Sequence, residues 1–210
     1  MAVLMSIRGR FSLGMIFLAR HRPEPAALLA RSIVAILSVL LGVCCTPQLL
    51  PAQSSQPAEY EVKAAFLYNF AKFVQWPPEA FPSPTAPITI CVISDERFQS
   101  ILGQTLIGKT AQDRPLVVRR LQSPPQDLRQ CHIVFVSSAE RGTIGDLLTG
   151  AKESSVLTVG ETDGFAQRGG MVNFVILDNR VRFEINHQSA RSSGLRISAR
   201  LLQLAANVWE

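Results

Sequence analysis

Ile88-Thr-Ile-Cys-Val-Ile93 is the stretch that decides the fold of this 210-residue chain. The run is almost wholly apolar and carries no charge, which is typical of a strand that is covered on both faces. Similar runs recur at 132–136 and 155–159. Helical patterns lie between them, so the chain predicts a mostly parallel central sheet with helices against its faces.

Two helices are expected between these strands. A helix capped by Asp95 is expected over about 95–106. A second helix, capped by Ser137 or Ser138, is expected to run through about residue 150. Each cap would place a side-chain oxygen where the first backbone N–H groups of a helix have no partner.

The segment between the first two buried runs adds one more strand. Residues 116–121 predict this strand, with basic residues near its end, and residues 124–127 predict a short helical turn. Right-handed crossovers between parallel strands would place the strand at 88–93 beside the strand at 132–136.

The first and last parts of the predicted α/β domain have patterns of different elements. Residues 59–75 predict an amphipathic helix. Residues 171–177 and 181–185 predict two strands joined by Asp178-Asn179, a hairpin signal, and residues 188–208 predict a closing helix. The complete order predicts a three-layer α/β sandwich with a mostly parallel central sheet, an antiparallel edge hairpin and flanking helices.

The basic charge of the chain belongs mostly to its beginning. The formal net charge is +5, with 21 basic and 16 acidic residues. Residues 1–52 carry five arginines and one glutamate, so the remainder is nearly neutral. A nearly neutral domain lacks the electrostatic footprint that phosphate binding requires, and we expect no nucleic-acid partner.

The beginning of the chain has the character of an export signal. The uninterrupted apolar run at 32–43 is short for a transmembrane helix, which needs about 20 such residues. We therefore expect residues 1–52 to be a cleaved signal peptide, residues 53–58 a short polar linker and residues 59–210 one α/β domain. An uncleaved N-terminal anchor is the alternative.

The four cysteines fall into two pairs. Cys44 and Cys45 lie in the leader, which leaves Cys91 and Cys131 for the exported chain. If the strands that carry them are neighbours, a disulfide is sterically possible. A structural disulfide, a redox-responsive disulfide and two buried free thiols all remain open at this point.

Motifs for catalysis are missing from the sequence. It contains no glycine-rich phosphate loop and no nucleophile elbow. His132 and His187 lie far apart and suggest structural or surface roles, and Asp95-Glu96 suggests a capped helix start. We expect no catalytic residue, no bound metal and no cofactor.

The predicted N-terminal helix has more aromatic side chains than one narrow core stripe needs. Burial in the core is the first interpretation. The second is a dimer or partner surface, because an apolar patch outside a single domain must be covered. The residues concerned are Phe66, Tyr68, Phe70, Phe73 and Trp76.

A set of motifs spans residues 59–208. It begins with Glu61-Val-Lys-Ala-Ala-Phe-Leu-Tyr-Asn-Phe-Ala-Lys-Phe-Val-Gln-Trp-Pro77 and continues with the strand at 88–93. Each of these motifs is a weak indication by itself, but together they resemble the YfiR family. The later members of the set are Gly164-Phe165, Gly169-Gly-Met-Val-Asn-Phe174, Arg182-Phe-Glu-Ile-Asn186, Gly194-Leu195 and Leu201-Leu202 before Ala205.

This resemblance implies a periplasmic regulator without catalytic activity. Such a protein binds the periplasmic sensor domain of an inner-membrane diguanylate cyclase, and thereby lowers cyclic-di-GMP signalling and biofilm formation. An outer-membrane lipoprotein can sequester it, and homodimers are expected. Cys91 and Cys131 match one family disulfide, whereas the second family pair, expected near 165–173, is missing. The resemblance points to Arg182, Phe183, Glu184 and Ile185 as the partner-binding segment.

Two other functions remain open on the sequence. A periplasmic small-ligand-binding module that feeds a sensor kinase or another receptor is the first, because open α/β sheets often bind ligands and the 163–170 turn is rich in glycine. An enzyme with a site assembled only in space is the second. Other members of so broad a family can also serve other membrane sensors.

Overall fold

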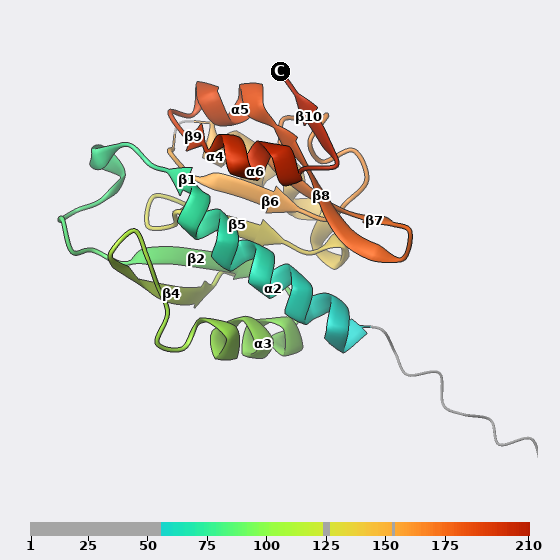
Figure 1. Cartoon of the computed structure of the whole chain (residues 1–210), viewed down its shortest axis with the longest axis horizontal. Helices are drawn as coiled ribbons and strands as arrows, with labels where there is room; N and C mark the ends of the chain where they lie inside the picture. The colour runs from blue at the N-terminus through green and yellow to red at the C-terminus, as the bar shows by residue number, and fades with distance from the viewer. Residues whose placement is uncertain (1–55, 124–126, 153) are drawn as a thin grey trace, which may run out of the picture. The chain divides into compact units, whose positions relative to one another are not determined.

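The computed structural model describes residues 56–123, 127–152 and 154–210 (Figure 1). The predicted signal peptide and most of the predicted linker lie outside these residues, as does most of the predicted turn at 124–127. Among the described helices, none combines the length and apolar character needed to cross a bilayer.

An eight-stranded sheet forms the centre of the fold, in the order β10-β8-β7-β6-β5-β2-β4-β3. The strands from β4 to β7 run parallel, and β7 turns back into β8. This confirms the mostly parallel sheet and its antiparallel hairpin. The short β10 pairs with β8 and forms the edge of the sheet beyond the hairpin. The strands are β2 (Ile88–Ile93), β3 (Thr110–Ala111), β4 (Arg114–Arg120), β5 (Ile133–Val136), β6 (Leu157–Gly160), β7 (Val172–Leu177), β8 (Arg180–Asn186) and β10 (Asn207–Trp209).

Alternate side chains of β2 enter two different cores. Ile88, Ile90 and Val92 join the larger core beneath α2 (Gln56–Phe73), α3 (Glu96–Leu106) and α6 (Ala199–Leu204). Cys91 and Ile93 join the smaller core with α4 (Ile144–Ala151). In Figure 1, α2 crosses the sheet diagonally, and the two cores make the fold a three-layer sandwich.

The expected neighbour relation between β2 and β5 is confirmed, and with it the disulfide. Ile90 pairs with Ile133 in the parallel β2–β5 ladder. Cys91 and Cys131 are bonded, with their Cα atoms 5.7 Å apart and 40 positions apart in sequence. Both are buried, so the bond joins β2 to the segment just before β5 inside the domain.

The helix starts agree with the sequence in one case and differ in the other. Asp95 Oδ1 accepts a hydrogen bond from Phe98 N at 2.8 Å, which confirms the cap of α3. The helix expected from 137 begins instead as η2, a 3₁₀ helix over Ser138–Thr143, before α4 starts. Ser137 makes no side-chain cap bond, and its buried Oγ has no hydrogen-bond partner among the described residues.

The hairpin signal is confirmed by backbone geometry. Asp178 and Asn179 have φ values of 50° and 57°. Two consecutive residues with positive φ form the tight turn whose twist matches paired strands, and Asp and Asn tolerate this conformation better than most residues. The turn carries β7 into β8 at the outer end of the hairpin.

The single closing helix expected over 188–208 is wrong. This segment folds as α5 (His187–Ser192), β9 (Arg196–Ile197), α6 and β10. Gly194 has a φ of 74° after α5, and Ser198 caps α6 through Leu201 N. Pairing of β9 with β1 (Val74–Gln75) and of β10 with β8 gives these backbone groups partners that one continuous helix would withhold.

Candidate functional site

The carboxyl ends of three parallel strands meet at one edge of the sheet, called here the carboxyl edge. β2, β5 and β6 end there, and each is followed by hydroxyl or acidic side chains. Open α/β sheets place ligands outside this edge. The residues that follow the strands are Ser94-Asp95, Ser137-Ser138 and Glu161-Thr162-Asp163.

Lys63 of α2 is the buried charge at this edge. It is 4% exposed and pairs with Glu161 at 2.5 Å and with Glu59 one turn earlier on the helix. Burial opposes the charge of Lys63, but its hydrogen bonds to Glu161 and Glu59 outweigh that effect and raise its pKa. The lysine therefore stays protonated between two carboxylates.

Glu161 links three elements through its two oxygens. Oε2 accepts from Lys63, while Oε1 accepts from Ser138 N at 2.8 Å and from Ser138 Oγ at 3.2 Å. The carboxylate thus joins α2 to the start of η2 and to the end of β6. The sequence interpretation missed it; its signal was an acidic residue directly after a buried strand, with Lys63 and Glu59 one helical turn apart on α2.

A second contact fastens α2 to α3 beside the first. Tyr60 Oη donates to Asp95 Oδ2 at 2.6 Å, and this bond is the main cause that raises the pKa of Tyr60 to about 12. Partial burial works against ionisation of Asp95, yet the bonds from Tyr60 and Phe98 lower its pKa overall. Asp95 is consequently an ionised cap and anchor, as its sequence position suggested.

An open cleft of about 520 Å³ lies beside this network, and we call it the carboxyl-edge cleft. One wall is polar and comes from the start of α2 and the ends of β5 and β6. The other wall is the outer part of β7, which is largely apolar. The lining residues are Glu59, Tyr60, Lys63, Ser138, Glu161 and Asp163 on the first wall and Phe174, Val175, Ile176 and Leu177 on the second.

The cleft has more carboxylates than cations, but its groups are not arranged as a metal site. Glu59, Glu161 and Asp163 face one cation, Lys63. In the described part of the chain, no group of three or more His, Cys, Asp or Glu side chains could hold a metal ion. The arrangement suits a positively charged group with an apolar body.

The predicted partner-binding segment is divided between surface and core. On β8, Arg182 is exposed and Glu184 is half-buried. Phe183 and Ile185 are 1% and 0% exposed, and both pack in the larger core. A partner that meets β8 in this conformation therefore reaches Arg182 and Glu184 rather than the whole segment.

The aromatic side chains of α2, together with Trp76 just after β1, are mostly used by the core. Phe70 and Trp76 are buried, and Phe66 packs against Phe174 and Phe183 with ring centres 5.9 and 5.1 Å apart. These contacts agree with the first interpretation, burial. Tyr68 and Phe73 remain half-buried beneath basic side chains such as Lys72.

The two described histidines lie away from the cleft. His132 is 5% exposed, stacks on Phe81 with ring centres 4.4 Å apart, and accepts a hydrogen bond from Thr89 N at Nδ1. Burial lowers its pKa, so the ring is neutral. His187 begins α5 and lies 3.3 Å from a carboxylate oxygen of Glu210.

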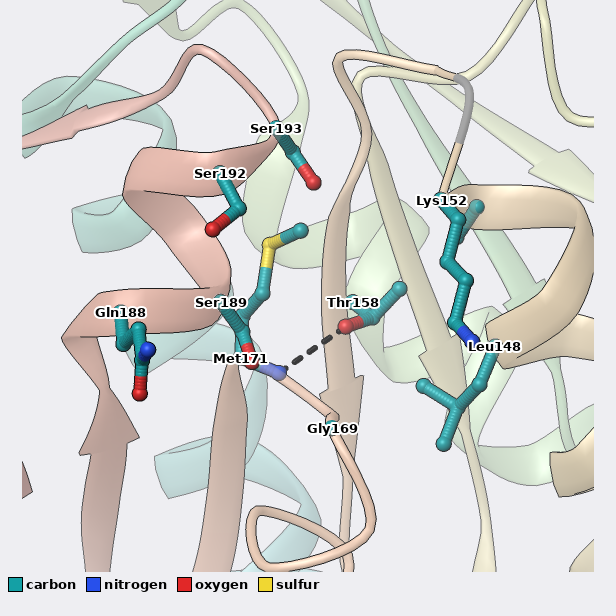
Figure 2. A pocket seen from close by; sticks show the side chains of 10 residues that line it. Leu148, Lys152, Thr158, Gly169, Met171, Gln188, Ser189, Ser192 and Ser193 are labelled. Atoms are coloured by element: carbon teal, nitrogen blue, oxygen red, sulfur yellow. Dashed lines mark hydrogen bonds between the residues drawn. The ribbon is translucent and has the colours of Figure 1, made fainter.

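A second hollow, of about 370 Å³, lies between α4 and α5 over the sheet (Figure 2). Its floor is Met171 and Thr158, whose hydroxyl accepts from Met171 N at 3.0 Å. Lys152 lies on the α4 side, and Figure 2 shows Ser193 pointing toward it from the end of α5.

Comparison with known proteins matches most of the chain to one family. The family model described as DUF4154, YfiR/HmsC-like, matches residues 60–206. No curated protein matches.

Two solved structures match part of this chain. One is the ABC domain in complex with L-Trp from Streptococcus pneumonia, with 10% identity, a TM-score of 0.47, and coverage of 71% of this chain and 60% of that one. The other is a conserved domain protein from Vibrio cholerae, with 12% identity, a TM-score of 0.46 and the same two coverages. The chain thus spans about three fifths of each.

Proposed function

The chain belongs to the YfiR/HmsC-like family, and from this membership we propose that it is a non-catalytic periplasmic protein that restrains an inner-membrane diguanylate cyclase. It binds the periplasmic sensor domain of the cyclase and so lowers cyclic-di-GMP synthesis. The family match over residues 60–206 is the observation that carries this proposal, because it covers nearly all of the described domain.

Two structural observations support it. The buried Cys91–Cys131 bond suits an oxidising compartment such as the periplasm. At the carboxyl edge, where an open α/β enzyme would bind its substrate, Lys63, Glu161 and the Tyr60–Asp95 pair bond in a network that anchors helices. The buried hydroxyls of Ser137 and Thr162 have no hydrogen-bond partner among the described residues. The surface of the domain, rather than a reaction centre, then carries the function.

Reconstitution with a membrane cyclase tests the proposal. The cyclase with a periplasmic domain that is encoded nearest this chain is placed in membranes, and cyclic-di-GMP synthesis is measured as the purified chain is added on the periplasmic side. We expect synthesis to fall with a saturating dose response. Undiminished synthesis, together with no binding between the chain and the isolated periplasmic domain, would contradict it.

Small-ligand binding is a second candidate function, favoured by the hollow in Figure 2. Polar groups from two helices converge there over an apolar floor, which is the usual build of a small-molecule site. Met171 is the only methionine in the described residues, so its labelled methyl group reports on the floor. A periplasmic metabolite that shifts this signal and raises the melting temperature would support the function; a panel that does neither would contradict it.

A further inference from the structure

The β7–β8 hairpin ends in apolar side chains that the domain does not cover. Ile176 and Leu177 are 54% and 47% exposed, and both line the carboxyl-edge cleft. Figure 1 shows the hairpin extending outward beside the start of α2. Exposed apolar residues are ordinary when isolated, but here two successive residues, one on each face of the hairpin, both line one cleft.

The opposite wall of the cleft is negatively charged. Lys63 is already neutralised by Glu59 and Glu161, and Asp163 adds a third, exposed carboxylate. The lining of this cleft therefore carries two more acidic than basic groups, while Arg141 and Arg168 lie in the adjoining hollow that shares Glu161 and Asp163 with it. An incoming cation would meet carboxylates on one side and apolar surface on the other.

We propose that the carboxyl-edge cleft docks a protein segment in which basic and apolar residues alternate, supplied by the restrained sensor domain. This inference rests on the proposed function for the source of the segment. The basic side chains lie against Glu59 and Asp163, and the apolar side chains cover Ile176 and Leu177. Charge complementarity selects this occupant over an acidic or wholly apolar one.

The location differs from the segment that the resemblance pointed to. Arg182 pairs with Val175 across the hairpin, whereas Ile176 pairs with Val181. Because successive residues of a strand point to opposite faces, Ile176 and Arg182 lie on opposite faces of the hairpin. Val175 and Leu177 share the face of Arg182, so it is a variant of Ile176 that distinguishes the cleft wall from the exposed part of β8.

Three variants test the docking surface in the cyclase assay described above. Ile176→Asp and Asp163→Lys each change one wall of the cleft, and both positions are exposed, so the fold should tolerate them. Ile107→Asp is the matched control, because Ile107 is an isoleucine 77% exposed at the end of α3, away from the cleft. Melting temperatures confirm that every variant is folded before it is assayed.

We expect Ile176→Asp and Asp163→Lys each to raise the concentration needed for half-maximal restraint at least tenfold. Ile107→Asp should leave that concentration within about twofold. If all three variants restrain the cyclase like the wild type, the cleft is not the docking surface although the proposed function stands. If Ile107→Asp fails as well, the effect is not specific to the cleft, and the proposal is equally overturned.

A second arm does not depend on the cyclase. The peptide acetyl-Leu-Arg-Leu-Arg-Leu-amide and its Glu-for-Arg counterpart are titrated into the full-length chain, and backbone amide shifts are followed. Perturbation centred on Ile176, Leu177 and Asp163 by the arginine peptide alone supports the proposal. Equal perturbation by both peptides, or by neither, overturns it. So does self-association that Ile176→Asp abolishes, because a second copy would then be the occupant.

Discussion

The two edges of the parallel sheet each bury an ionisable side chain, in opposite ways. At the amino end of β5, His132 is neutral and enclosed by Phe81 and Trp76, whose indole N–H donates to the His132 carbonyl at 3.0 Å. At the carboxyl edge, Lys63 is charged and held between two carboxylates that line an open cleft. The first edge is closed by rings and a disulfide, and the second is held by ion pairs.

This difference teaches where a protein of this fold can offer a binding surface. A neutral imidazole can be enclosed by apolar rings because no charge is buried with it, and in His132 Nδ1 is hydrogen-bonded while Nε2 has no hydrogen-bond partner among the described residues. A buried ammonium needs carboxylates, and those carboxylates keep part of their surface toward water. The charged edge can therefore be stable and accessible at once, whereas the histidine edge is stable because it is closed.

Removing the disulfide should give the largest loss of stability, and it affects the closed edge. Cys131 lies directly before His132 and closes a loop of 40 residues to Cys91. Replacing both cysteines by serine should lower the free energy of unfolding by about 4 kcal/mol in the chain-entropy view. Urea unfolding of the wild type with and without reductant measures the same difference, and equal curves would contradict a structural role for the bond.

At the open edge, Lys63→Met should cost somewhat less, about 3 kcal/mol of unfolding free energy. The substitution leaves Glu161, whose side chain is 13% exposed, without its cation. Denaturant unfolding at neutral pH measures the loss. The matched control is Lys72→Met on the same helix, where the lysine is exposed over Tyr68 and Phe73. Lys72→Met should lower the free energy of unfolding by less than about 1 kcal/mol. Equal losses for the two variants would mean that the ion pairs of Lys63 do not stabilise the open edge.

Local elements at both edges could be predicted from sequence, and the long-range contacts of the open edge could not. The strand at 88–93, the cap at Asp95 and the turn at Asp178-Asn179 depend on local patterns, so the sequence carries them directly. The contact between Lys63 and Glu161 joins residues 98 positions apart. Neither residue belongs to a motif that announces such a pair, so only the packing of α2 on the sheet brings them together.

The prediction of one closing helix at the end of the chain was wrong for a related reason. Residues 188–208 carry enough apolar residues at helical spacing to predict one helix, yet β9 and β10 leave the helical path to pair with β1 and β8. Tertiary hydrogen bonds overrode the local pattern. Gly194 and Ser198 were signals of the break, since one adopts positive φ and the other caps a new helix.

The closed edge should also respond to pH. Unfolded histidine takes up a proton near its ordinary pKa of about 6.5, while burial lowers the pKa of His132 in the folded state. Between these two values the unfolded state binds more protons, so stability falls as pH falls below about 6.5, by at most about 1.4 kcal/mol per unit. His132→Gln keeps an acceptor for Thr89 N and should flatten this dependence. A variant with the wild-type slope would show that other groups cause it.

The smallest effect is expected at the hairpin tip. Ile176→Asp and Leu177→Asp should each change the free energy of unfolding by less than about 1 kcal/mol, similar to Ile107→Asp, because all three side chains are largely exposed. Denaturant unfolding of the three variants checks this. A loss of several kcal/mol at the tip would mean that the apolar wall belongs to the core, and the contrast between a closed and an open edge would fail. Near-neutral values mean that the fold does not require apolar side chains there, so any loss of cyclase restraint in Ile176→Asp must come from the contact with the partner.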